Sequence, residues 1–408
     1  MASTYLDMAA MNAALKEFYD GQVVENMVYK DNPFFAMVKK KTDVGGKYYP
    51  VPIITSASQG RSSTFANAQG NQTPVQLKEF LMTTKDDYSI ATVTGKVMEA
   101  AATDRASFLR GSQLAIDGAI RSITLSVASS LFRSGTGTIG RISTLSTGVI
   151  TLASASDAVQ FEENMVLQAN ATDGGAAPRA ALGYVIAVDV DAGTVTVSAT
   201  GFGGAAGDPA LWVTGDYILV QGDNNAKLSG LEAWFPLTAP TTGDNFYGVD
   251  RSVQPVRLAG SRGDFSGIAI EEALVQASSK VGLQGGRPDV CIMSYAGYSQ
   301  LQNALGSKVQ YVEFKGPADI AFRGIRVNGQ TSEIKVFPDR NCPGGRMYLL
   351  QMDTLELISL GDVPHIKKDD GITMLRVGNA DAGEVRIVYY ANLTCNAPAW
   401  NGAFQIAA

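Results

Sequence analysis

The hydrophobic residues between Asp319 and Gly361 form short runs separated by turn signals, a pattern typical of β-strands. Asn328-Gly329 stands between two of these runs. This dipeptide favours a tight hairpin because both residues tolerate positive φ. The runs predicted to form strands are Ile325–Val327, Ile334–Val336, Met347–Leu350 and Leu355–Ile358. We therefore expect this stretch to form the core sheet of one domain.

A long hairpin is predicted nearer the N-terminus. Lys47–Thr55 has a strand pattern, Ser56–Pro74 is polar, and apolar alternation returns over Val75–Val97. Pro50 and Pro52 lie two residues apart, so their missing N–H groups fall on the same strand edge. Because the hairpin has little core of its own, we expect it to rest on a neighbouring subunit. The candidate contact residues in it are Tyr48, Tyr49, Arg61 and Phe65.

The longest predicted helix runs from Asp104 to Phe132, where apolar residues keep helical spacing and no proline intervenes. Its length would be about 43 Å at 1.5 Å per residue. Gly111 and Gly118 lie on one face, and each costs about 1 kcal/mol relative to alanine inside a helix. We expect this pair to mark a close approach of a neighbouring backbone. Asn328 and Gly329 are further candidate inter-subunit contacts.

The segment Ile139–Gly230 has its own charge character. It holds nine acidic and three basic residues, which accounts for the whole net charge of −6. Gly/Asp turns separate its short strand patterns, and no strong helical period is present. We predict a small all-β domain, a barrel or a sandwich. Its expected strands are Val149–Leu152, Met165–Gln168, Ala181–Val190, Thr194–Ser198 and Tyr217–Val220.

The remaining patterns are mixed, and the fold class predicted for the whole chain is α+β. Amphipathic helices are expected at Met8–Tyr19, at Ser266–Gly282 with Ser266 as N-cap, and at Ser294–Gly306. The other predicted strands are Asp289–Met293, Thr373–Val377 and Glu384–Tyr390.

Composition narrows the class of protein. A chain of 408 residues is expected to hold two or three domains. The negative net charge argues against a protein whose main task is gripping nucleic acid. Three widely spaced cysteines predict buried, reduced thiols. We expect no signal peptide and, since no apolar run reaches about 20 residues, no membrane span.

Candidate chemistry is sparse. Gly135–Gly140 matches the G-x-G-x-x-G pattern, but it follows a helix and precedes β-structure, so we interpret it as a flexible linker. The single histidine, His365, has the sequence context of a loop. Lys39-Lys40-Lys41 is interpreted as a solvated turn, with a weak contact to a packaged acidic polymer as the alternative. We expect no catalytic site, no cofactor and no metal, and therefore no enzyme.

The order of these elements resembles the Hong Kong 97-type fold of tailed-bacteriophage major capsid proteins. In local sequence the resemblance is clearest in Phe246–Arg251, Arg257–Gly260, Gly324–Gly329, Ile334–Asp339 and Pro343–Leu350. It implies six parts. Residues 1–40 would be an N-terminal arm, 41–97 an extended loop, 98–138 a peripheral domain with a spine helix, 139–232 an inserted β-barrel-like domain, 233–364 an axial domain, and 365–408 the return to the peripheral domain.

The resemblance also implies a role. The chain would self-assemble into hexamers and pentamers of an icosahedral shell, in the virion, after assembly in the host cytoplasm. The shell would enclose double-stranded DNA without reading its sequence. Scaffolding, portal and decoration proteins are possible separate partners, and scaffolding could be absent. An encapsulin-like, non-viral shell that holds cargo protein is the alternative. More distant alternatives are another phage structural or carbohydrate-binding β protein, and an enzyme.

Some members of this family cross-link covalently through a lysine in the extended loop, whereas no lysine lies between Tyr48 and Leu77 here. We therefore expect no such cross-link. Boiled particles should migrate on SDS gels as a single band of subunit size, and a ladder of multimers would contradict this expectation.

Overall fold

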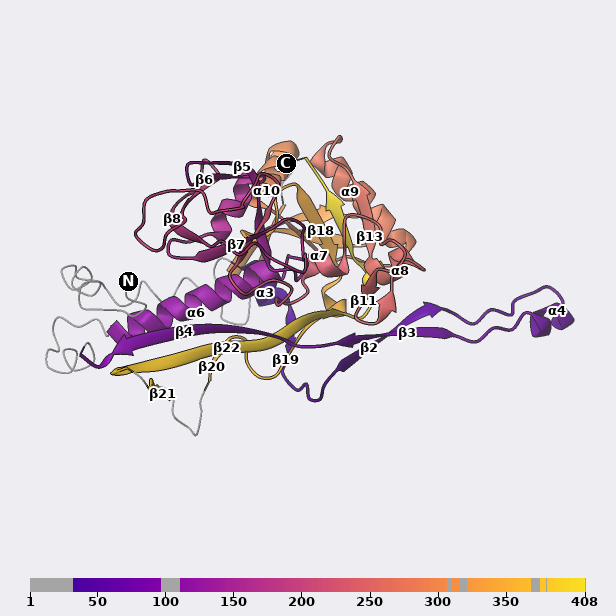
Figure 1. Ribbon diagram of the computed structural model, residues 1–408. Helices are drawn as coiled ribbons and strands as arrows, with labels where there is room; N and C mark the ends of the chain where they lie inside the picture. Colours follow the sequence, from indigo (N-terminus) through magenta and orange to yellow (C-terminus); the bar gives the residue numbers. More distant parts are fainter. Residues whose placement is uncertain are drawn as a thin grey trace.

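The computed structural model describes residues 32–96, 111–306, 310–315, 321–367, 375–378 and 380–407. Figure 1 shows a body of helices and sheets from which one long hairpin projects far to one side. The helix expected at Met8–Tyr19 lies outside the described residues, as does most of the expected arm. The short elements not treated below are α3 (Pro33–Met37), α7 (Leu231–Trp234), α8 (Pro255–Ala259), β11 (Asn245–Phe246), β12 (Val249–Asp250), η3 (Met352–Thr354) and η4 (Pro398–Trp400).

A seven-stranded sheet has the order β13-β23-β18-β14-β17-β16-β15. The turn at Asn328-Gly329 joins β16 to β17 as predicted, and the Gly329 amide donates to the Ser332 carbonyl at 2.9 Å. The strands are β13 (Ser261–Asp264), β14 (Val290–Met293), β15 (Gln310–Lys315), β16 (Ala321–Asn328), β17 (Glu333–Pro338), β18 (Arg346–Leu350) and β23 (Gly402–Gln405).

Both faces of this sheet are covered. Successive side chains of a strand point to opposite faces. In β18, Met347 and Leu349 pack in a cluster with helices α9 (Ile270–Leu283) and α10 (Tyr295–Leu305). Tyr348 and Leu350 instead join the largest apolar cluster of the chain, which we call the central cluster. Burial on both sides explains why the sequence of β18 is continuously apolar.

A second sheet has the strand path β1-β19-β22-β20, with β21 and β4 also paired to β22. β4 pairs with β22 over ten residues, and helix α6 (Gly111–Ser130) lies along these two strands (Figure 1). The strands are β1 (Lys39–Lys41), β4 (Lys85–Thr94), β19 (Leu355–Ser359), β20 (His365–Ile366), β21 (Leu375–Arg376) and β22 (Ala382–Cys395). α6 corresponds to the predicted spine helix, whose first residues lie outside the described part.

One predicted strand placement is wrong, and one strand was not predicted. The run Leu355–Ile358 was expected in the same sheet as β18, but β19 pairs with β22 and β1 in the second sheet. The segment from His365 onward was expected to return to the peripheral domain. β22 does so, but β23 completes the seven-stranded sheet between β13 and β18. An apolar run shows that a strand will be buried, but it does not specify which sheet will bury it.

The acidic segment forms a closed barrel with the strand order β10-β5-β6-β9-β8-β7. All five predicted strands are present, and β5 is an addition, because its first residues had been interpreted as a linker. Gly137 is needed there: its φ is +85°, and a Cβ would lie 2.3 Å from the Asp223 carbonyl oxygen. The strands are β5 (Thr138–Ser146), β6 (Val149–Leu152), β7 (Val166–Asn170), β8 (Gly183–Asp189), β9 (Thr194–Ser198) and β10 (Tyr217–Val220).

Polar contacts of the turn η1 (Ala155–Gln160) help to fix the barrel to the body. The Arg133 guanidinium at the end of α6 pairs with Asp157 at 2.6 Å. The Gln160 side-chain amide donates to the Asn341 side-chain oxygen at 3.2 Å. These contacts are buried or half-buried, where hydrogen bonds to charged groups contribute about 1.5–3 kcal/mol. The barrel therefore has a defined position on the body.

Of the other local predictions, some agree with the structure and some do not. The helix expected at Ser294–Gly306 is present as α10, and Ser294 caps it by accepting a hydrogen bond from the Gly297 amide. Ser266 does not cap α9: its hydroxyl donates to the Asp264 carboxylate, and the helix begins four residues later at Ile270. Lys39-Lys40-Lys41 is a strand, β1, and not a turn. All three cysteines are free and buried, as predicted. Among the helices the structure describes, none is long and apolar enough to cross a membrane.

Gly230 lies where the chain returns from the barrel to the end of α6. A Cβ on this residue would come within 2.3 Å of the Leu131 carbonyl oxygen. We expect Gly230→Ala to lower the free energy of unfolding by about 2–3 kcal/mol, because backbone must shift to make room. Gly207→Ala, where a Cβ meets open space, should change it by less than about 0.5 kcal/mol. Chemical denaturation of both variants measures their free energies of unfolding. Equal losses of stability in the two variants would contradict the prediction.

Candidate assembly surface

The projecting hairpin is built from strands β2 (Tyr49–Ser56) and β3 (Gln76–Met82), with the short helix α4 (Phe65–Gly70) near its tip. Figure 1 shows it extending well beyond the body. The predicted hairpin therefore exists, but its second arm ends at Met82. The alternation seen after Lys85 in the sequence belongs to β4 and the second sheet.

The base of the hairpin is anchored to the body through one face. Val51, Phe80 and Met82 point inward and are buried in the central cluster. The Phe80 ring lies 5.2 Å from the Trp234 ring, edge to face, an arrangement that adds to the hydrophobic term. Further out, the Arg257 guanidinium donates to the Thr55 carbonyl at 2.6 Å. The body thus fixes the direction in which the hairpin points.

The opposite face of the hairpin is exposed and mostly apolar, with Glu79 as the charged residue on it. Alternation along β2 and β3 brings to this face Ile54, which is 60 % exposed, and Leu77, which is 61 % exposed. Leu81 lies on the same face nearer the base, at 41 % exposed. Scattered surface leucines are ordinary, but apolar residues gathered on one face of a projecting element are typical of a contact surface.

The free edge of β2 lacks two hydrogen-bond donors. The Leu81 amide donates to the Tyr247 carbonyl at 3.1 Å, so its backbone groups point away from β2. Leu81 is paired with Pro50, and in an antiparallel ladder the two residues of such a pair both point outward. Pro50, and Pro52 two residues on, therefore present their missing N–H groups on the outer edge.

The predicted contact residues do not form one site. Phe65 is 82 % exposed near the tip, where Arg61 is also exposed, and Tyr48 is exposed near the base. Tyr49 is half-buried, and its hydroxyl accepts from the Lys41 ammonium at 2.9 Å, which raises the pKa of that lysine. Asn328 and Gly329 belong to the distant seven-stranded sheet. Sequence reasoning missed Ile54 and Leu77, which period-two alternation along the predicted strands could have found.

Gly118 is exposed on α6, and nothing in the described chain lies within 4 Å of the position of a Cβ. Gly111 is the first residue of α6 as described. Within the residues that the structure describes, nothing therefore requires a glycine at position 118. The prediction that a neighbouring backbone approaches here stays a prediction.

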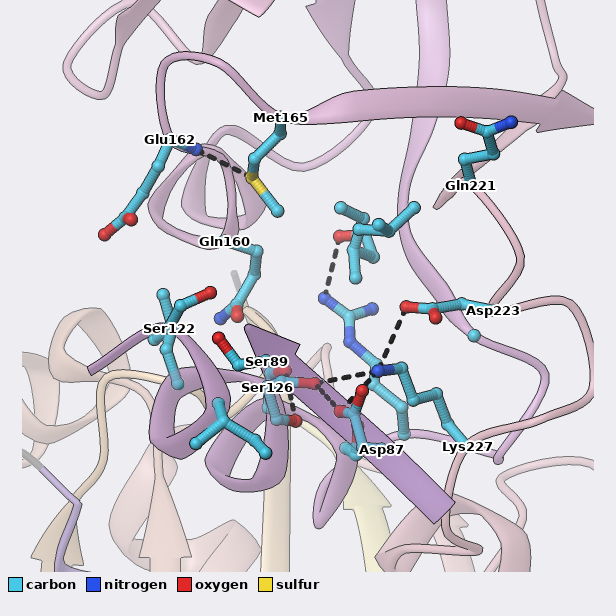
Figure 2. Close-up of a pocket in the computed structure, with 18 of the residues that line it drawn as sticks. Asp87, Ser89, Ser122, Ser126, Gln160, Glu162, Met165, Gln221, Asp223 and Lys227 are labelled. Carbon is cyan, nitrogen blue, oxygen red and sulfur yellow. Dashed lines mark hydrogen bonds and ion pairs between the residues drawn. The ribbon is translucent and has the colours of Figure 1, made fainter. Parts of the chain in front are cut away.

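A cavity of about 270 Å³ lies between α6, β4 and the barrel (Figure 2). Ser126 on α6 lies 2.9 Å from the Lys227 ammonium, a pairing that in some enzymes activates a serine. Here Lys227 also pairs with Asp87 at 2.6 Å and with Asp223 at 3.1 Å. Lys227 is therefore an ion-pair partner of two carboxylates in this cavity. The Nδ1–H of His365 donates to the Asp362 carbonyl oxygen at 2.6 Å, and the imidazole lies 6.3 Å from the Tyr390 ring.

Comparisons with known proteins identify the fold. No family model matches the sequence, and no curated protein matches it either. Among solved structures, a chain of the capsid asymmetric unit of cyanophage A-1(L) matches over 93 % of this chain and 94 % of its own, at 14 % identity and a TM-score of 0.53. The capsid of a native GTA particle matches at 8 % identity over the full length of both chains, with a TM-score of 0.48.

The encapsulin of the holo-SrpI complex from Synechococcus elongatus PCC 7942 matches 99 % of this chain and 96 % of its own, at 9 % identity and a TM-score of 0.45. The match to the cyanophage capsid chain shows that this chain has a capsid-type fold of mixed helices and sheets, as the sequence predicted. At such low identity the likeness is one of fold.

The variant Gly118→Ala tests whether this glycine allows a neighbouring backbone to approach or has no structural role. In the isolated subunit the variant should be stabilised by about 1 kcal/mol, since alanine is the better helix former. Shell formation should nevertheless fall if a neighbouring backbone packs at this position. Denaturation of unassembled subunits and particle yield by sedimentation measure the two effects. Ser122→Ala, also exposed on α6, is the matched control. Unchanged particle yield in Gly118→Ala would remove this residue from the candidate contacts.

Proposed function

We propose that this chain is the major capsid protein of a tailed-phage-type shell. It assembles into hexamers and pentamers that close into an icosahedral particle. The observation that carries the proposal is the projecting hairpin, anchored on its inner face and mostly apolar on its outer face, in a chain that has the fold of a phage capsid protein. The described part of the chain does not cover Ile54 and Leu77, and a second copy would.

The energetics suit a shell. Full burial of a leucine or isoleucine side chain contributes about 1.5–3 kcal/mol, so one hairpin gives a contact of moderate strength. Each subunit of a closed shell makes several such contacts, and their cooperation stabilises the particle without any single strong interface. Moderate contacts also allow incorrectly placed subunits to dissociate during assembly.

Within this proposal each part has a task. Residues 1–40 form the arm, 41–97 the extended loop with the β2–β3 hairpin, and 98–138 the peripheral domain with spine helix α6. Residues 139–232 form the inserted barrel. Residues 233–364 form the axial domain around the capsomer axis, apart from β19, and 365–408 return to the peripheral domain, apart from β23. These two exceptions follow from the observed strand pairing.

The distribution of charge along the chain suggests which parts face the outside and the inside of the proposed shell. The barrel segment carries the whole net charge of −6, and the rest of the chain is balanced. An acidic barrel suits the outer surface, and a balanced remainder would let double-stranded DNA fill the interior without adhering to the wall. Assembly in the host cytoplasm, with separate portal, decoration and, where used, scaffolding proteins, completes the proposal.

Electron microscopy of the expressed protein tests it. Closed particles, or rings of five and six subunits, are expected. A chain that stays monomeric under all assembly conditions would overturn the proposal. Native particles should contain DNA, whereas particles filled with an enzyme would instead indicate an encapsulin-like shell that holds cargo protein.

The double variant Ile54→Ser/Leu77→Ser tests the hairpin face. The subunit should fold normally, because both side chains are exposed, while particle yield should fall at least about tenfold, the effect of about 1.4 kcal/mol lost from contacts. Val190→Ser removes an exposed apolar side chain from the end of the barrel and serves as the control. Equal yields from the double variant and the wild type would exclude this face as a contact.

A further inference from the structure

An ionic cluster lies where the barrel returns to the body, with Lys227 buried and Asp87 and Asp223 half-buried (Figure 2). The Lys227 ammonium is 2.6 Å from an Asp87 carboxylate oxygen, 3.1 Å from one of Asp223 and 2.9 Å from the Ser126 hydroxyl. Asp87 is on β4 and Ser126 on α6, whereas Asp223 and Lys227 follow β10, the last barrel strand. Four hydrogen-bonding groups from three parts of the chain therefore meet at the junction.

The charges of this cluster do not balance. Two carboxylates share one ammonium, and the Lys227 side chain is only 10 % exposed. Burial raises the pKa of Asp223 to about 6, and Asp87 adds to this effect, although Lys227 opposes it. Above that pH the cluster carries one uncompensated negative charge in a poorly solvated place, which is unfavourable.

The surrounding groups do not supply the missing positive charge. Tyr389 of β22 is buried, and burial, with Asp87 next, raises its pKa well above the ordinary value, so it stays neutral. The Lys85 ammonium of β4 donates to the Asn225 carbonyl at 3.2 Å. Two more charged groups line the same cavity, but each has its own ion-pair partner: Arg133 pairs with Asp157, and Glu162 with Arg121.

We propose that this cluster is a proton-sensitive latch between the barrel and the spine helix, in which protonation of Asp223 holds the junction closed and its ionisation loosens it. With Asp223 neutral, Lys227 and Asp87 form a balanced pair beside the Ser126 hydroxyl. With Asp223 ionised, hydration of its carboxylate favours opening of the segment between β10 and Gly230. This inference concerns the subunit alone and does not depend on the assembly proposed above.

The direction of the pH dependence follows from linkage. The pKa of Asp223 is about 6 when the junction is closed and 3.8 when the group is solvated. The closed form therefore binds the proton more tightly. Closure gains stability as the pH falls through about 6, and the gain is complete only below 3.8. Between pH 7.5 and pH 5.0 the equilibrium should shift toward closure about tenfold.

Hydrogen–deuterium exchange of the full-length chain measures this shift. Peptides covering residues 221–230 should show protection factors, corrected for intrinsic exchange, about tenfold higher at pH 5.0 than at pH 7.5. Peptides from β9 inside the barrel provide the internal reference. Sedimentation at both pH values confirms that the assembly state is the same. Equal protection factors at the two pH values would overturn the proposal.

Three variants assign the effect. Asp223→Asn, which mimics the neutral acid, should be as protected at pH 7.5 as the wild type is at pH 5.0. Asp87→Asn leaves Lys227 to a single carboxylate, so the protection should rise only at a pH below that of the wild type. Asp191→Asn, exposed on the barrel, should leave the wild-type profile unchanged.

A wild-type pH profile retained in Asp223→Asn would overturn the proposal. If Asp223→Asn does not fold, the pH profiles of the protection factors in the wild type and in Asp87→Asn test the proposal. If the midpoint pH of Asp87→Asn equals that of the wild type, this cluster is not the source of the pH dependence.

Discussion

The central cluster is the packing interaction on which the other parts of the structure depend. Trp234, immediately after the return from the barrel, lies at its middle, fully buried, with its indole N–H donating to the Leu393 carbonyl of β22 at 2.8 Å. Phe80 brings in the base of the hairpin, Phe132 the end of the spine helix, and Tyr348 the seven-stranded sheet. Because interiors are close-packed, the orientation of each part is set by the shapes of these few large side chains.

Because the hairpin, the spine helix and the seven-stranded sheet share one apolar cluster, they are not mechanically independent domains. β22 pairs with β4, β19, β20 and β21, so a single strand of 14 residues organises one whole sheet. The barrel has its own apolar core, yet η1 and the Arg133–Asp157 pair fix it to the body. A projecting hairpin can direct assembly only if its base is held this firmly.

Much of the fold could be predicted from local patterns, and the reasons for the failures are physical. The barrel strands were found because β-alternation and turn residues are local signals, and α10 because its apolar residues keep helical spacing. The places of β19 and β23 were missed because pairing partners are set by distant residues. The candidate surface was predicted as an element but not residue by residue. Tyr48 and Phe65 are exposed. Alternation along each strand could have marked Ile54 and Leu77 as outward positions, but that the two lie side by side follows only from the β2–β3 register.

The proline-bearing edge of β2 has a consequence for the cell that makes this protein. A long exposed strand edge can join copies of a chain edge to edge into open-ended fibres. Pro50 and Pro52 remove donors that such growth would need, while leaving the outer face of the same strand available. The edge of the hairpin therefore resists aggregation, while its face stays free for the contacts proposed above.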